Sequence, residues 1–153
     1  MLALTASCDF RSGTARKEME KFSDTPAPEP LPFFSPAASP VDPADVIEVD
    51  TSIEGTVVGT NGFDEKKALS CNKFDRVIVN GGRNSLTIKG PCRQIMMNGD
   101  GNRIAADAAM DIVFNGSDNS VTYWRVVNGK RPTVTDSQQD NVVKQVAKTG
   151  KIK

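Results

Sequence analysis

The sequence predicts an all-β protein, a small β-solenoid of about four to five rungs preceded by a disordered N-terminal tail. Two observations predict this fold. Apolar residues alternate with polar ones over short stretches, which is the period of a β-strand. The alternating stretch, an Asn-Gly pair and a second asparagine also recur every 17 to 18 residues. One such unit cannot bury its own apolar face, so a fixed period of this kind is typical of stacked rungs. The three clear copies are Val77–Asn84, Ile95–Asn102 and Ile112–Asn119.

Each copy carries the residues of two corners. Asparagine followed by glycine suits positive backbone dihedral angles, so the chain can turn there. The second asparagine falls at the next corner, where its amide can form a ladder with the rungs above and below. We therefore expect a structural role for these residues, with ligand binding as the alternative. The predicted corner residues are Asn80, Gly81, Asn84, Asn98, Gly99, Asn102, Asn115, Gly116 and Asn119.

The chain divides into four segments, and proline marks the main boundary. Seven of the nine prolines lie between Pro26 and Pro43. Proline at this density disfavours helices and sheet ladders, so this stretch is expected to be a spacer. The predicted segments are a signal remnant over 1–8, a disordered Pro/Ala-rich stem and linker over 9–45, the solenoid over 46–146, and a basic C-terminal tail over 147–153.

The predicted solenoid is less regular at both ends. The first clear alternation is Val46–Val49, and short strands are expected at Thr56–Val58 and Ala68–Cys71. After the three copies, Pro132–Asp136 and Asn141–Val143 indicate a decayed further rung with an insertion. Terminal repeats are expected to be atypical because they close the stack against water.

The N-terminus resembles a bacterial lipoprotein signal. Small residues precede Cys8 and polar sequence follows it, although Thr5 stands where leucine is usual. Only seven residues precede Cys8, fewer than an apolar signal region of ~7–15 residues with its charged start requires. We interpret the segment as the end of a signal that begins further upstream. The prediction is an exported protein, lipidated at Cys8 and anchored on the periplasmic or extracellular side of a bacterial membrane. The alternative is a soluble chain with a chance cysteine.

The two other cysteines are Cys71 and Cys92, 21 residues apart. That separation is about one rung plus a small loop. It places them on adjacent rungs, where their Cα atoms can come within the ~4.4–6.8 Å that a disulfide requires. A disulfide is expected if the chain is exported, with two buried free thiols as the alternative.

Several motifs together resemble a known family. They are the Asn-Gly-x-x-Asn repeats, Ser70-Cys71, Gly90-Pro91-Cys92, Val121-Thr122-Tyr123 and Pro132–Asp136. Over residues 46 to 146 the chain resembles the bacterial domain-of-unknown-function family 3060. The resemblance implies a small repetitive β protein, often exported or lipid-anchored, and it leaves the activity open. The chain departs from the family pattern at Ala105–Ala109, where we expect a weak or locally bulged strand.

Composition excludes some classes of function. The chain has 19 basic and 19 acidic residues, a pI near 6.3 and no histidine. A neutral chain has no basic field to gather nucleic acid, so no nucleic-acid partner is predicted. Without histidine it lacks the commonest general base and a common metal ligand. We predict no cofactor.

Calcium binding is one alternative, because glycine- and aspartate-rich turns also occur in calcium-binding repeats. Those repeats have a nine-residue period with aspartate at a fixed place. Here Asp100 is two residues after its asparagine, Asp118 is three after, and the first copy has Arg83 and no aspartate. This irregular spacing disfavours calcium.

A carbohydrate-active or carbohydrate-binding β-helix is the other alternative. Its candidate carboxylates are Asp75, Asp107 and Asp111, if they project from one face. Catalytic carboxylate pairs need separations of ~5–9.5 Å and a groove for the sugar chain. Four or five rungs offer little groove, which disfavours an enzyme.

The sequence therefore favours a non-catalytic envelope protein that presents a β face to an unknown envelope protein or glycan. Trp124 and Arg125 form the aromatic and basic pair proposed for that interface. Alternation that buries Tyr123 directs Trp124 outward, and exposed tryptophan beside arginine is typical of binding hot spots. The alternative is that Trp124 covers the end of the stack.

Overall fold

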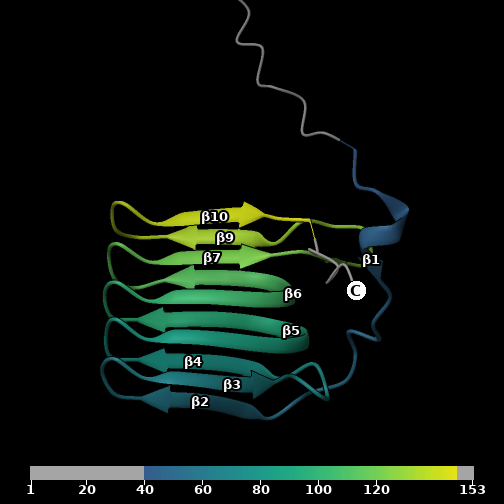
Figure 1. Ribbon diagram of the computed structural model, residues 1–153. Coiled ribbons are helices and arrows are strands. Elements are labelled where there is room, and N and C mark those ends of the chain that lie inside the picture. The colour runs from purple at the N-terminus through teal and green to yellow at the C-terminus, as the bar shows by residue number, and fades with distance from the viewer. Residues whose placement is uncertain (1–39, 148–153) are drawn as a thin grey trace, which may run out of the picture. The chain divides into compact units, whose positions relative to one another are not determined.

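The computed structural model describes residues 40–147, which form a β-solenoid of about five turns (Figure 1). The only helical element in this part of the chain is one 3-10 turn, and the named strands pair in parallel. The predicted fold class is therefore confirmed. The elements are η2 (Pro43–Asp45), β1 (Val46–Ile47), β2 (Val57–Asn61), β3 (Lys66–Ser70), β4 (Arg76–Asn80), β5 (Ser85–Asn98), β6 (Arg103–Phe114), β7 (Ser120–Tyr123), β8 (Val126–Val127), β9 (Thr133–Asp136) and β10 (Val142–Gln145).

The stack has two sheet faces. One, here called the amide face, consists of β2, β4, the second half of β5, the second half of β6 and β9. The other, here called the basic face, consists of β3, the first half of β5, the first half of β6, β7 and β10. Each rung runs along the amide face, turns at an Asn-Gly corner, returns along the basic face and passes to the next rung at the opposite edge.

The core lies between these two faces. Alternation directs two side chains of each central strand inward, as the sequence predicted, and burial removes their apolar surface from water. The amide face contributes Val77, Val79, Ile95, Met97, Ile112 and Phe114, and the basic face contributes Leu86, Ile88, Ile104, Ala106, Val121 and Tyr123.

The alanine-rich strand is neither weak nor bulged, so that expectation was wrong. β6 is continuous from Arg103 to Phe114, and the register shift lies between Ile88 and Pro91 of the neighbouring β5. Ala109 pairs in register with Cys92, and both are fully buried. Small side chains fit here because β6 turns from one face to the other beside the disulfide.

The N-terminal end of the stack is closed by polar side chains. Thr60 and Lys67 occupy inward register positions below the core. Between them the Glu65 carboxylate accepts one hydrogen bond from the Thr60 hydroxyl and pairs with the Lys67 ammonium at 2.8 Å. Both hydrogen bonds lower the pKa of Glu65. Charged groups at this position oppose the pairing of another strand with the end of the stack.

Residues 40–56, here called the strap, run along the edge opposite the Asn-Gly corners, as the blue segment of Figure 1 shows. We expected Val46–Val49 to form the first rung, which was wrong, because β1 pairs with β8 near the other end of the stack. The side chain of Asn128 holds the strap by hydrogen bonds to the backbone of Val49 at 2.8 and 3.0 Å. Ordered structure also begins before residue 46, since Val41 packs on the core.

Candidate functional site

The Asn-Gly corners form one continuous edge of the stack, and their glycines are required by close packing. A Cβ atom on Gly81 would lie 1.9 Å from the Gly62 carbonyl oxygen, and one on Gly99 would lie 2.1 Å from that of Gly81. Gly116 does not have positive φ, yet its Cβ would lie 2.2 Å from the Gly99 oxygen. Contact between rungs therefore excludes a side chain even where the turn itself would allow one.

Each corner has a residue with φ near +60° at the position before the second asparagine position. The φ angles there are 57° at Asp64, 56° at Arg83, 70° at Gly101, 58° at Asp118 and 61° at Asp140. Aspartate and glycine tolerate this conformation better than most residues. The sequence reasoning missed this role, and the recurrence of aspartate at this position was the available signal.

An outer asparagine ladder follows the exposed side of the corners. Asn80 donates through Nδ2 to Oδ1 of Asn61 at 2.6 Å, Asn98 donates to Asn80 at 2.8 Å, and Asn115 donates to Asn98 at 2.8 Å. All four side chains lie at exposed positions. Water can replace these bonds, so the outer ladder contributes little to stability.

An inner asparagine ladder lies in the core side of the same corners. Asn84, Asn102 and Asn119 are almost completely buried. Nδ2 of Asn102 donates to Oδ1 of Asn119 at 3.0 Å and to the Gly81 carbonyl at 3.1 Å. Oδ1 of Asn102 accepts from both the backbone N–H and Nδ2 of Asn84, at 3.1 and 3.0 Å. Every polar atom of this buried amide has a protein partner, which makes it a structural group.

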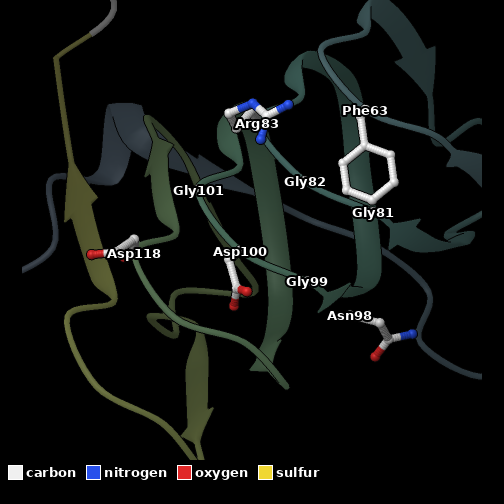
Figure 2. A pocket seen from close by; sticks show the side chains of 9 residues that line it. All are labelled: Phe63, Gly81, Gly82, Arg83, Asn98, Gly99, Asp100, Gly101 and Asp118. Atoms are coloured by element: carbon white, nitrogen blue, oxygen red, sulfur yellow. The ribbon is translucent and has the colours of Figure 1, made fainter.

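A shallow hollow of about 590 Å³ lies on this edge, and Figure 2 shows its lining. The glycines at 81, 82, 99 and 101 line it. Phe63 stands at one side with 67% of its surface exposed, while Asp100 and Asp118 stand at the other. The hollow therefore combines an exposed aromatic ring with amide and carboxylate groups.

Arg83 adds a positive charge to the hollow. It donates two hydrogen bonds to the Asp64 carboxylate, at 2.9 and 2.8 Å, and these lower the pKa of Asp64. The guanidinium carbon lies 6.0 Å from the centre of the Phe63 ring, within cation–π range. The ring also lies close to Gly82, yet 67% of the Phe63 surface is exposed, so part of the ring is accessible for stacking on a polar ring such as a sugar.

The two carboxylates of the hollow belong to different rungs. Oδ1 of Asp100 accepts the backbone N–H of Ser117 at 2.7 Å. Asp118 occupies the left-handed position of its corner, with a φ angle of 58°. Across residues 40–147, no group of three or more histidine, cysteine, aspartate or glutamate side chains is placed to hold a metal ion.

Asp75, one of the candidate catalytic carboxylates, is buried at the opposite edge. It accepts hydrogen bonds from the backbone N–H groups of Thr56, Asn72 and Lys73, at 2.7, 2.8 and 3.2 Å, and from the Thr56 hydroxyl at 3.0 Å. Burial tends to raise the pKa of Asp75, but these hydrogen bonds outweigh it and the pKa is lowered. Asp75 therefore joins the strap to the stack.

Asp107 and Arg125 form a two-bond ion pair at the same edge. Burial tends to raise the pKa of Asp107, but the hydrogen bonds and charge of Arg125 lower it below its ordinary value, and the Gly90 N–H adds to this. Asp111 lies elsewhere, in the amide-face part of β6. The three candidate carboxylates therefore do not lie on one face.

The proposed interface pair occupies the opposite edge too. Trp124 is half-buried, and its buried Nε1–H group helps to lower the pKa of the Asp107 carboxylate. Trp124 is therefore less exposed than strand alternation predicts, and its role in an interface stays a prediction. Strand alternation ends with β7 at Tyr123, so it does not determine the direction of the next side chain. Arg125 is bound to Asp107 and does not present a free charge.

Cys71 and Cys92 form the predicted disulfide, with 5.3 Å between their Cα atoms. The bond joins consecutive rungs at the edge opposite the asparagine ladders, and both residues are buried. The prediction of a disulfide is thus confirmed. Cys8 lies outside the described residues.

Comparison with known proteins identifies the repeats and no activity. No curated protein and no solved structure matches the chain significantly. In the described residues no helix is long and apolar enough to cross a membrane. Residues 79–140, from the end of β4 to the corner before β10, match the model of the family described as protein of unknown function (DUF3060), which confirms the family resemblance of the repeats.

Proposed function

We propose that this is an exported, lipid-anchored protein of the bacterial cell envelope whose solenoid binds a partner outside the membrane and performs no catalysis. The observation that carries the proposal is the Cys71–Cys92 disulfide. Structural disulfides persist in oxidising compartments and are rare in the cytosol. With three cysteines in the chain, this pairing leaves Cys8 as the single thiol for lipidation.

The structural use of the carboxylates supports binding over catalysis. Asp75 holds the strap, and Asp107 holds Arg125. An acid or base catalyst needs a carboxyl group that is within reach of a substrate and free to exchange a proton. Both groups have lowered pKa values and full sets of protein partners, so neither suits that role.

Anchoring is tested by replacing Cys8 with serine. The unmodified chain should sediment with membranes and incorporate labelled palmitate, whereas the Cys8→Ser variant should be released as unlabelled protein. Ser7→Ala is the matched control, because it keeps a small residue before the cysteine and should remain anchored. An unmodified chain that is unlabelled and not membrane-bound would show that the anchor does not exist.

Carbohydrate binding in the corner hollow is the second candidate function, favoured by the exposed ring of Phe63 beside Arg83. Phe63→Ala should abolish retention of the full-length chain on immobilised neutral glycans. Val57→Ala is the matched control, since Val57 is also exposed, at 62%, but does not line the hollow. Equal retention of both variants would argue against this site.

A further inference from the structure

The outward side of the basic face carries an excess of positive charge. Its basic residues are Lys66 on β3, Lys89 on β5, Arg103 on β6 and Lys144 on β10, and all four are exposed. Its one acidic residue is Asp107 on β6, whose charge is neutralised by the ion pair with Arg125. The positions between them are mainly alanine, serine and threonine, for example Thr87. The surface is therefore flat, hydroxyl-bearing and positive, although the chain as a whole has equal numbers of basic and acidic residues.

These four cations are free of protein partners within residues 40–147. Elsewhere in the same part of the chain, four cations, Lys67, Arg83, Arg93 and Arg125, form ion pairs with carboxylates, whereas Lys73, Arg76 and Lys130 do not. No ion pair or hydrogen bond involves the side chains of Lys66, Lys89, Arg103 or Lys144. The positive charge of this face is therefore available to a ligand.

The amide face shows that this charge is specific to one side. In one outward row it carries Arg76, Gln94 and Asp111 side by side in register, so both signs occur together. An anionic ligand is therefore attracted to the basic face more strongly than to the amide face.

The cations are spaced along the stack. Lys66 and Arg103 occupy the same outward row two strands apart, since each pairs in register with Ser85. Strands lie ~4.8 Å apart, so these positions recur at about 10 Å. Lys144 lies two strands beyond Arg103, in the adjacent row. Charges distributed in this way match a polymer with repeated anionic groups better than a single small anion.

We propose that the basic face binds an anionic polysaccharide whose chain lies along the stack. Carboxylate or sulfate groups of the polymer meet Lys66, Arg103 and Lys144, and the serine and threonine hydroxyls between them bond to sugar hydroxyls. The inference rests on the proposed binding role, for which it names the partner class, and it is independent of the lipid anchor.

The uncharged residues of this face favour a polysaccharide over two other anionic partners. A membrane surface would be gripped by aromatic or large aliphatic side chains among the cations, and Val142 is the one large apolar residue exposed on this face. Single-stranded nucleic acid would be held by aromatic rings on which bases stack, and the outward rows of these strands contain none.

The test measures binding of the full-length chain to a polyuronate (alginate) and a sulfated glycan (heparin), with dextran as the uncharged control. We expect binding to at least one anionic polymer, weakening as salt screens the charges, and none to dextran. The double variant Lys66→Glu, Arg103→Glu should bind at least about tenfold more weakly. Arg76→Glu with Lys130→Glu is the matched control, because it makes the same change of net charge away from the basic face and should bind within about twofold of the unmodified chain.

Melting curves establish that each variant is folded, and Lys66→Gln with Arg103→Gln replaces the charge reversal if that variant fails to fold. Absence of binding to both anionic polymers would overturn the proposal. An equal loss of binding in the matched control variant would also overturn it. The same holds if the chain binds anionic phospholipid vesicles or single-stranded DNA more tightly than the polysaccharides. None of these outcomes alters the fractionation result for Cys8, so failure of this inference and failure of the anchor are distinguishable.

Discussion

The two edges of the stack are built in different ways. At the Asn-Gly edge every central rung repeats the same contacts, with a glycine against a glycine and an amide against an amide. At the opposite edge each rung is different, with the Cys71–Cys92 disulfide, the Asp75 hydrogen bonds and the Asp107–Arg125 pair. The repeated edge aligns the rungs, and the irregular edge joins the strap to them.

The largest expected effect comes from breaking the irregular edge at its covalent bond. Replacing Cys71 and Cys92 together by serine should lower the free energy of unfolding by about 3 kcal/mol, because the bond closes a loop in the unfolded chain. Urea denaturation without reductant measures this. The unmodified chain with reductant should match the variant, and an unchanged midpoint would show that the disulfide does not stabilise this edge.

A smaller effect separates the two ladders of the repeated edge. Asn102→Ala should lower the free energy of unfolding by about 2 kcal/mol, because it leaves the Gly81 carbonyl and the Asn84 backbone N–H buried without partners and removes one of the two bonds of the Asn84 amide. Asn98→Ala removes an exposed amide that water can replace, and should cost about 0.5 kcal/mol. Thermal melts of the two variants are the comparison. Equal losses would mean that burial does not distinguish the ladders.

The repeated edge was also the part that could be predicted from sequence. Three copies of one pattern predicted the fold, the inward residues and the positions of Asn84 and Asn102, since each repeat restates the same geometry. The 21-residue separation of the cysteines was enough to predict the disulfide, because it is close to the length of one rung.

The irregular edge could not be predicted, because its contacts join residues that no repeat relates. Asn128 binds the backbone of Val49, 79 residues away. Asp107 and Arg125 come together because the chain leaves β7 after Tyr123 and turns along this edge. Alternation within each strand predicts that Lys66, Lys89, Arg103 and Lys144 point outward. That they lie on one face follows only from the pairing of the strands, which the sequence does not show directly.

The smallest expected effect is a loss of stability in acid that originates at the irregular edge. The folded-state pKa values of Asp75 and Asp107 lie below the ordinary value of about 3.9. Their contribution is therefore fully present above about pH 4 and is lost as the pH falls through the folded values. The urea midpoint should fall less steeply with decreasing pH for the double variant Asp75→Asn, Asp107→Asn than for the unmodified chain. An identical slope would assign the acid sensitivity to other groups.

Native-state hydrogen exchange tests most directly whether the buried asparagine ladder holds the rungs together. The backbone N–H groups of Glu65, Asn84, Asn102 and Asn119 donate to the Oδ1 atom of the asparagine one rung further along, at 2.9 to 3.1 Å. If this ladder is a structural element, these corner amides should exchange as slowly as those of the central strands. Exchange as fast as in the exposed turn over residues 50–53 would contradict the account, because the corners would then open without unfolding of the stack.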